Sequence, residues 1–528
     1  MPTTPPKEMK TPFTGDEIQK AVKSLKNNKS PGTDNLKTEL IKYGPPVLSE
    51  GIAGIYNDMA RTGEHPIEVK EGILIPLPKP GKKQGPPGHL RPIILLSVLR
   101  KILAICLIRR AAYKFYQRIP ITQAAYREGR STTELIFTFK VLAEKAVTSK
   151  SYKIHLLMLD MSKAFDTVKR AELFRDLKEI LDDDELHLLM IMLKDVELQV
   201  RVGKEMGRKI KTNIGVPQGD SLSPLLFTLY LAQSLKPKRL QTSEEHNYSL
   251  PPRPAEELVP QNLMDHTYST PIEEELNIDQ QYADDISYIT DAYHIHNHHK
   301  STVPPTIMER NLCVNNEKTE EYEVARTGSE EWKKCKLVGS LIDSTCDINR
   351  RRGLALTAYN KLKNILESRK VNTKLKVRVL NTYVKSIFLY NCETWTVTKE
   401  LENSIDVFQR TLLRRALNVI WTDKVSNEEL YNRAQMKEWS SEIKKRRLKW
   451  LGHLLRLPEE TPARQALHQA MLPVKRPRGK PKTTWLSLVR KDMEILKIDF
   501  CLQNMSHVVA LANDRSAWDS LVGRAMSF

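Results

Sequence analysis

Tyr282-Ala283-Asp284-Asp285 is preceded by Ile278 and followed by the β-prone run Ile286-Ser287-Tyr288-Ile289-Thr290. Asp suits tight turns, and apolar and aromatic residues on both sides suit paired strands. The stretch therefore predicts a hairpin whose tip carries two adjacent carboxylates. Successive strand residues face opposite ways, so one carboxylate can bind a metal ion while the other points aside or reaches a second ion. Taken alone, an Asp-Asp pair in a turn is usually only a turn.

A third acid, Asp160, supplies the pair with a partner. It ends the apolar run Ile154-His155-Leu156-Leu157-Met158-Leu159, which predicts a buried strand. Asp160 and Asp284 are far apart in the sequence, so only a folded domain can bring them together. Two-metal phosphoryl-transfer sites are commonly assembled in this way, and magnesium prefers such hard oxygen ligands.

Three blocks occur in the order 159–168, 215–224 and 282–285, and they read LDMSKAFDTV, GVPQGDSLSP and YADD. In this order they resemble the catalytic blocks of the reverse transcriptases of non-LTR (LINE-type) retrotransposons. The resemblance continues through segments at 28–34, 76–82, 91–93, 312–319, 337–339 and 448–453. It covers the chain from about Phe13 to about Trp518 and implies an RNA-directed DNA polymerase that adds dNTPs to a primer 3′-hydroxyl.

The resemblance implies an α+β chain with the right-hand polymerase fold. This fold has fingers, a palm with a small antiparallel sheet and an α-helical thumb, and an α-rich basic extension follows. The expected boundaries are 1–12 for a linker-like tail, 13–150 for the N-terminal extension and fingers, 151–343 for the palm, 344–435 for the thumb and 436–528 for the basic region. Within the palm, the Pro-rich and acidic stretch 235–277 is typical of a surface loop.

The resemblance also implies roles for individual side chains. The expected ligands of two Mg²⁺ ions, for which Mn²⁺ can substitute, are Asp160, Asp284 and Asp285. The expected nucleotide-binding residues are Lys79, Arg91, Phe165, Gln218, Gly219 and Lys318. Lys79 would meet the triphosphate as a point charge and Arg91 through its planar fork. Phe165 would exclude a ribose 2′-hydroxyl by bulk, which selects dNTPs.

Each of these nucleotide-binding residues also has a plainer structural explanation. Lys79 and Arg91 are compatible with solvated loop cations, and Phe165 is compatible with an ordinary core residue. Gln218 and Gly219 also fit a turn that opens a helix at Ser221. The functional interpretation is favoured because the three blocks occur in order.

The composition agrees with a nucleic-acid partner. Lys and Arg number 83 against 64 Asp and Glu, which gives a net charge of +19. Such a chain binds polyanions in a salt-dependent way. Six cysteines show no CxxC pairing, so a zinc module is not expected and a reduced intracellular setting is. No apolar stretch is long enough to span a bilayer, and the N-terminus has no signal-peptide core.

The last third of the chain carries the densest basic stretches. The expected nucleic-acid-binding residues there are Lys444, Lys445, Arg446, Arg447, Trp450, Lys475, Arg476, Arg478, Lys480 and Lys482. The cations would meet phosphates, while Trp450 and Trp485 would offer stacking platforms. The alternative is a solvated charged face with tryptophans in the core. The expected partners are an RNA template, a DNA primer or target DNA, and dNTPs, without a membrane.

Several local patterns predict secondary structure. Residues 16–25 predict a helix that Thr14 caps, with Glu17 completing a capping box. The histidines 294, 296, 298 and 299 favour a solvated loop over a metal site. Residues 375–387 predict an amphipathic thumb helix. Its apolar face would be Leu375, Val379, Leu380, Tyr383, Val384 and Ile387, and its exposed cations Lys374, Lys376, Arg378 and Lys385.

Two alternatives to a reverse transcriptase remain open. One is an inactive retroelement remnant that still binds nucleic acid, and the other is an RNA-dependent RNA polymerase, against which Phe165 argues. The sequence upstream of Phe13 has no room for the endonuclease that such elements usually encode, so a separate or truncated polymerase is expected. The basic stretches are compatible with a ribonucleoprotein in the cytoplasm and the nucleus.

Overall fold

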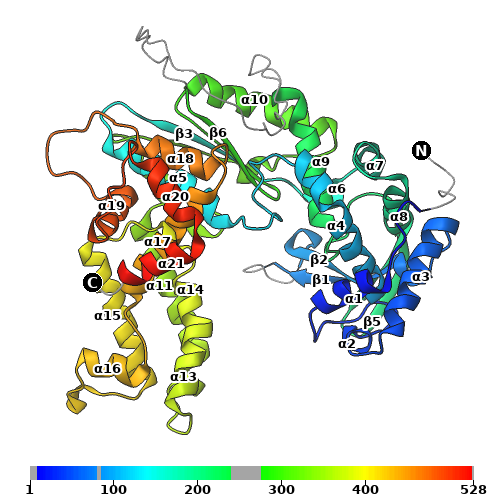
Figure 1. Cartoon of the computed structure of the whole chain (residues 1–528), viewed down its shortest axis with the longest axis horizontal. Helices are drawn as coiled ribbons and strands as arrows, with labels where there is room; N and C mark the ends of the chain where they lie inside the picture. Colours follow the sequence, from blue (N-terminus) through cyan, green and yellow to red (C-terminus); the bar gives the residue numbers. More distant parts are fainter. Residues whose placement is uncertain (1–8, 80–84, 240–274, 526–528) are drawn as a thin grey trace, which may run out of the picture.

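The computed structural model describes residues 9–79, 85–239 and 275–525. The chain mixes helices and sheets, as the α+β expectation requires (Figure 1). The central part of the stretch 235–277 lies outside the described residues, whereas residues 235–239 continue a helix and Asn277 begins a strand. Within the described residues, no helix has the length and apolar character that crossing a membrane requires.

An antiparallel sheet, the central sheet, carries the predicted hairpin. Its strands lie in the order β6 (Asn277–Tyr282), β7 (Asp285–Thr290), β3 (Ile154–Leu159) and β8 (Glu320–Val324). Tyr282 pairs with Asp285, so Ala283 and Asp284 form a two-residue loop. β3 pairs with both β7 and β8. The hairpin and the buried strand predicted from the sequence are therefore confirmed.

Helices cover both faces of the central sheet. One face packs against α9 (Ser223–Arg239) and α10 (Tyr293–Glu309), and Leu157 lies in that core. The opposite face packs against α5 (Thr132–Thr148), and Leu156 lies in that second core. Because successive strand residues face opposite ways, a strand covered on both faces has a continuous apolar run, as β3 does.

A second sheet, the outer sheet, lies toward the N-terminal half of the molecule (Figure 1). Its strands lie in the order β2 (Leu90–Leu96), β1 (Glu71–Pro78), β4 (Val196–Val202) and β5 (Glu205–Thr212). β1 and β2 form an antiparallel pair, while β1 and β4 are parallel. The helices of this half are α1 (Gly15–Ser24), α2 (Thr38–Lys42), α3 (Val47–Thr62), α4 (Val98–Arg118), α6 (Ala164–Thr167), α7 (Arg170–Lys178) and α8 (Asp183–Leu193).

After β8 the described chain is helical apart from the short pair β9 (Lys336–Leu337) and β10 (Ser340–Leu341). A helical arm extends away from the central sheet (Figure 1). It contains α11 (Ser344–Lys361), α12 (Lys363–Leu366), α13 (Thr373–Val379), α14 (Ser386–Phe388), α15 (Lys399–Ala416) and α16 (Asn427–Ala434). The final helices are α17 (Trp439–Arg456), α18 (Pro462–Met471), α19 (Trp485–Ile495), α20 (Met505–Asn513) and α21 (Arg515–Ala525).

The N-terminal helix α1 has the predicted N-cap but not the predicted capping box. Thr14 is the N-cap, and its hydroxyl accepts a bond from the Glu17 N–H at 3.3 Å. The Glu17 carboxylate does not close a capping box. It accepts bonds from Arg110 of α4 at 2.7 and 2.6 Å instead. The stronger charge-assisted pair has taken the carboxylate away from the helix start.

The predicted solvated histidine loop is wrong, because these residues form the first turns of α10. His296 is buried against the central sheet, and its Nε2 lies 3.2 Å from Glu321 of β8. The His299 ring stacks on Tyr288 of β7 at 4.1 Å, and burial lowers its pKa to about 4. Pattern alone missed the helix because polar residues, His296 and His299, occupy the face that packs on the sheet.

The thumb helix predicted from the sequence exists, and Leu380 and Val384 of its predicted apolar face are buried, but three other residues depart from the prediction. Residues 380–385 form a wide π-helical turn after α13, which rotates the residues that follow it. Leu375 and Tyr383 are 46% and 55% exposed, whereas Lys376 is buried. The Lys376 ammonium donates to the Ala416 carbonyl at 2.7 Å, near the end of α15. Lys376 is therefore not an exposed cation, and a carbonyl at a helix C-terminus is a favourable partner for it.

The C-terminal helices are part of the same core as α5 and the central sheet. Phe137 of α5 makes edge contacts with Trp450 of α17 and Trp485 of α19, at ring distances of 5.9 and 4.7 Å. On the same helix, Glu144 accepts bonds from the Thr396 hydroxyl and from the Trp485 N–H. Burial raises the pKa of Glu144 to about 7, although both bonds and nearby Lys140 oppose the shift.

Glu144 predicts a pH dependence of stability. Its pKa is higher in the folded chain than in the unfolded one, so its favourable contribution is complete below about pH 4.5 and is lost as the pH rises toward 7. Glu144→Gln mimics the protonated form and removes this loss. We expect the free energy of unfolding of the variant, measured with urea, to increase relative to that of the wild type as the pH rises from 5 to 7. Parallel curves for the two proteins would contradict this assignment.

Candidate active site

Three carboxylates meet at the end of the central sheet. Asp284 lies in the β6–β7 loop, Asp285 begins β7, and Asp160 follows the last residue of the neighbouring strand β3. Burial raises the pKa of Asp285 to about 6, and the charges of Asp284 and Asp160 add to the shift. Burial and the Asp160 charge also raise the pKa of Asp284. The fold thus gathers like charges that oppose one another, an arrangement that is unfavourable unless a cation joins it.

Lys318 supplies a cation at this place. Its Nζ lies 2.8 Å from Asp160 Oδ2, and its charge lowers the pKa of both Asp284 and Asp285. Among the described residues, no three His, Cys, Asp or Glu side chains are already arranged as a metal-binding group. The donor set still fits divalent magnesium in its chemistry, because it offers hard carboxylate oxygens whose repulsion a cation relieves.

The two cations expected at the triphosphate lie on the β1–β2 hairpin. Arg91 pairs with Leu77 across the hairpin, is exposed, and lowers the pKa of Asp284. Lys79 follows β1 and is exposed, and its Nζ donates to the Gly88 carbonyl at 3.0 Å. The Arg91 charge therefore reaches the carboxylates, while Lys79 lies at the end of β1 where the connection to β2 begins.

The first two sequence blocks pack against each other beside the aspartates. Phe165 is half-buried and stacks on Phe227 of α9, with ring centroids 4.6 Å apart. The Gln218 amide donates to Asp166 Oδ1 at 3.2 Å. Burial raises the pKa of Asp166, and this bond opposes the shift. These contacts fix the positions of the Phe165 and Gln218 side chains.

The structure explains why residue 219 is a glycine. Its φ is +125°, and a Cβ atom there would lie 2.5 Å from the carbonyl oxygen of Ile94 in β2. The Ile94 N–H also donates to the Gln218 carbonyl at 2.7 Å. The glycine thus lets a strand of the outer sheet approach the backbone closely, which ties the second block to the β1–β2 hairpin.

Gln123 was missed by the sequence analysis. It is fully buried, and its Oε1 accepts bonds from the N–H groups of Ala283 and Ala125, both at 3.0 Å. Its Nε2 donates to the Ala283 carbonyl at 3.3 Å. Ala283 has a φ of +57°, a strained value for a residue with a side chain. Gln123 thus holds both backbone groups of the residue before Asp284, and a lone glutamine in 121–125 carries no pattern that would reveal this.

Removal of the Gln123 hydrogen bonds should slow primer extension while all three aspartates remain in place. Gln123→Met keeps the volume of the side chain but none of its bonds to Ala283. If the chain extends primers, we expect the single-turnover rate to fall roughly 10- to 100-fold, because small misplacements of a reacting group have such effects. Gln123→Ala should behave similarly. Wild-type rates in Gln123→Met would show that packing alone positions the loop.

The first basic stretch of the C-terminal region is mostly committed to internal contacts. Arg447 is buried and pairs with Asp492 at 2.7 Å, and Trp450 is buried against Phe137. Lys444 lies 3.8 Å from Asp492. The expected nucleic-acid contacts of Arg447 and Trp450 are therefore corrected, because neither reaches solvent, and the same holds for stacking on Trp485.

Most of the other cations of the C-terminal region are exposed, so they are able to contact a nucleic acid. Arg446 is half-buried and pairs with Glu442 at 3.0 Å, whereas Lys445 is exposed. The exposed residues of the second basic stretch are Lys475, Arg476, Arg478, Lys480 and Lys482. This stretch links α18 to α19, so the fold presents its charges on a connecting segment.

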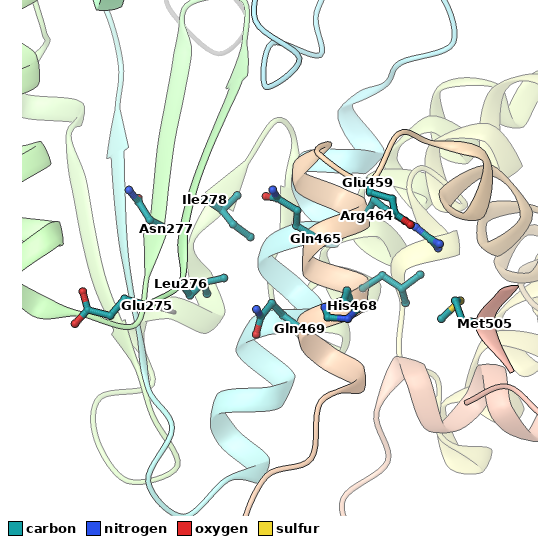
Figure 2. A pocket seen from close by; sticks show the side chains of 11 residues that line it. Glu275, Leu276, Asn277, Ile278, Glu459, Arg464, Gln465, His468, Gln469 and Met505 are labelled. Atoms are coloured by element: carbon teal, nitrogen blue, oxygen red, sulfur yellow. The ribbon is translucent and has the colours of Figure 1, made fainter. Parts of the chain in front are cut away.

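A pocket of about 460 Å³ lies apart from these residues, between β6 and α18 (Figure 2). Figure 2 shows Asn277 and Glu275 on the strand side and Met505 on the far side of α18. Arg464 lines the pocket and is buried, and its Nη1 has no hydrogen-bond partner among the described residues. The pocket contains none of the residues that the sequence analysis assigned to catalysis.

The comparisons with known proteins agree with the motifs. The family model described as reverse transcriptase (RNA-dependent DNA polymerase) matches residues 77–453, more than half of the chain. The probable RNA-directed DNA polymerase from transposon BS of Drosophila melanogaster is 32% identical over 223 residues, which cover 42% of this chain and 24% of that protein. The Pol polyprotein from the type-1 retrotransposable element R2 of Popillia japonica is 28% identical over 228 residues, 42% of this chain and 30% of that protein.

The chain aligns with about a quarter of the length of the first relatives that it matches. A solved structure of apo telomerase from Candida tropicalis, truncated from its C-terminal domain, aligns at a TM-score of 0.36 and 15% identity over 52% of this chain and 53% of that one. The resemblance to reverse transcriptases of non-LTR retrotransposons is confirmed by the relatives and the family model. The chain belongs to the reverse transcriptase (RNA-dependent DNA polymerase) family.

Proposed function

We propose that this chain is an RNA-directed DNA polymerase that extends a primer 3′-hydroxyl with dNTPs on an RNA template. The observation that carries the proposal is the meeting of Asp160 with Asp284 and Asp285 at one sheet end, within the region that the family model matches. In this proposal the central sheet is the palm, the outer sheet belongs to the fingers, and the helical arm is the thumb of a right-hand polymerase.

Asp160, Asp284 and Asp285 would hold two divalent ions. Such ions, when bound, polarise the primer hydroxyl and stabilise the pyrophosphate leaving group. Lys318 pairs with Asp160 and keeps a positive charge at the carboxylates. Arg91 would bind the incoming triphosphate through its planar fork, and Lys79 would add a point charge at the end of β1. Gln218 and Gly219 would line the nucleotide and template side.

The RNA template would be held by phosphate contacts, for which the exposed stretch 475–482 is suited. The DNA strand that is extended would be a primer or a target DNA. A ribonucleoprotein with these partners would act in the cytoplasm and the nucleus.

Phe165 predicts the choice of sugar. Its half-buried ring is held against Phe227, and in this proposal its edge would face the sugar of the incoming nucleotide. Phe165→Val should admit a ribose 2′-hydroxyl and raise the efficiency of rNTP relative to dNTP incorporation by roughly tenfold or more. The measurement is the ratio of kcat/KM values for one matched nucleotide pair. An unchanged ratio with intact dNTP extension would leave Phe165 as a core residue only.

The test of the proposed function is primer extension by the purified chain on an annealed RNA template, with magnesium and dNTPs. A DNA product that disappears with a chelator would support the proposal. Salt-sensitive RNA binding without any product would instead favour an inactive retroelement remnant. Extension with rNTPs in preference to dNTPs would favour an RNA polymerase.

A further inference from the structure

Trp421 is the outlier among the seven tryptophans of the chain. Its side chain is 91% exposed, whereas the other six are 7% exposed or less. It lies in a short turn, Trp421–Asp423, that connects α15 to α16 on the helical arm (Figure 1). The preceding Ile420 is also 60% exposed. Two adjacent large apolar side chains kept in water at one turn are suited to contact a partner.

A recess rich in arginine adjoins this turn. It has a volume of about 430 Å³, and Ile420 forms part of its wall. Its other lining residues are Glu367, Arg369, Thr411, Arg414, Arg415, Asn418 and Val419. Three guanidinium groups thus share the recess with one carboxylate. That carboxylate is already engaged, because Glu367 accepts a bond from Arg415 at 3.0 Å.

The remaining two arginines differ in how they are held. Arg414 Nη2 donates to the Val425 carbonyl at 2.9 Å and to Asn427 Oδ1 at 3.3 Å, so the turn after Trp421 fixes its position. Arg369 is exposed and forms no ion pair with any described residue. The recess therefore contains one guanidinium in a fixed position, Arg414, and one that is free to adjust, Arg369. No carboxylate of the recess neutralises either charge, so both can bind an anion.

We propose that Trp421 and this recess bind single-stranded nucleic acid, with a base stacked on the Trp421 ring and a neighbouring phosphate held by Arg369 and Arg414. An exposed aromatic ring beside a basic groove is the general design of single-strand binding, because every base has a face to stack and every linkage carries a charge. A purely apolar protein partner would leave the arginine charges unpaired at the contact, which is costly. The charge therefore favours nucleic acid over an apolar protein surface.

This inference goes beyond the proposed polymerase activity and does not depend on the aspartates. It can be tested with the full chain in a chelator and without dNTPs, so failure of catalysis would not affect the outcome. Because six tryptophans are buried, iodide in solution should quench mainly the Trp421 emission. Trp421→Phe identifies that component, since it removes the exposed indole and keeps a stacking ring.

The measurement is tryptophan fluorescence during titration with a single-stranded RNA or DNA oligonucleotide of mixed sequence. We expect the nucleic acid to quench the iodide-accessible component and to shield it from iodide. Trp421→Ala should weaken binding roughly 5- to 100-fold, the range that loss of one stacked base produces, and Trp421→Phe should recover most of the affinity. Arg369→Ala should reduce the slope of log affinity against log salt by about one.

Tyr113→Ala is a matched control, because Tyr113 is an exposed aromatic residue of α4, 74% exposed, in the other half of the molecule. Its variant should bind as the wild type does. The proposal is overturned if Trp421→Ala binds with unchanged affinity, or if Trp421 stays accessible to iodide at saturating nucleic acid. It is also overturned if Trp421 becomes shielded only as protein concentration rises, which would make this surface a contact between copies of the chain.

Discussion

Asp284→Asn is expected to reduce primer extension on an RNA template by roughly a thousandfold or more. The substitution keeps the size of the side chain and removes one of the charges that would hold divalent ions. Asp284 lies in a two-residue loop whose backbone Gln123 clamps on both sides, so no neighbouring carboxylate can move into its place without breaking buried hydrogen bonds. The loss should appear in the rate of a single nucleotide addition.

The same variant should retain its fold and its nucleic-acid binding. Burial and the Asp160 charge raise the pKa of Asp284, which means that its ionised form is unfavourable in the metal-free chain. The neutral amide should therefore melt at the same temperature or above it. A lower melting temperature together with lost template binding would show that the substitution acts on the structure rather than on the reaction.

Asp220→Ala is expected to lower the free energy of unfolding by about 3–5 kcal/mol, the usual cost of leaving one partner of a buried ion pair alone. Asp220 belongs to the second sequence block, yet it is buried and accepts a bond from Arg100 Nε at 3.0 Å. Arg100 also donates to the carbonyls of Val69 and Met192. The pair therefore joins the second block to α4, and through Arg100 to α8 and to the turn that precedes β1.

A double-mutant cycle separates the pair from the other contacts of its members. Asp220→Leu combined with Arg100→Met removes both charges and keeps much of the volume, so its loss should be smaller than the sum of the two single losses. Urea unfolding provides the four free energies. Additive losses would mean that the two side chains stabilise the fold independently.

The β6–β7 hairpin and the strand β3 were predictable because short-range chemistry decides them. A short apolar run favours a buried strand, and an Asp-rich turn between β-prone residues favours a hairpin, as β3 and β6–β7 show. The order of the motifs then placed Asp160 beside Asp284. That step depended on the family resemblance, since nothing local in the two segments specifies their pairing.

Features that depend on distant contacts were not predictable from local pattern. Lys376 has the sequence environment of a solvated cation, but the end of α15 offers it a carbonyl, and it is buried. Arg447 and Trp450 lie in a strongly basic stretch, yet Asp492 and Phe137 draw them into the core. Gln123 is ordinary in sequence and becomes a clamp only because residues 122–124 lie beside β6.

The rate of single dNTP addition to a primer on an RNA template, measured for the wild type and Asp284→Asn side by side, tests the central claim most directly. We predict extension by the wild type that requires a divalent ion, and extension at least about a thousandfold slower by a variant that still binds the template. Equal rates for the two proteins would contradict the assignment of the aspartates as the centre of DNA synthesis.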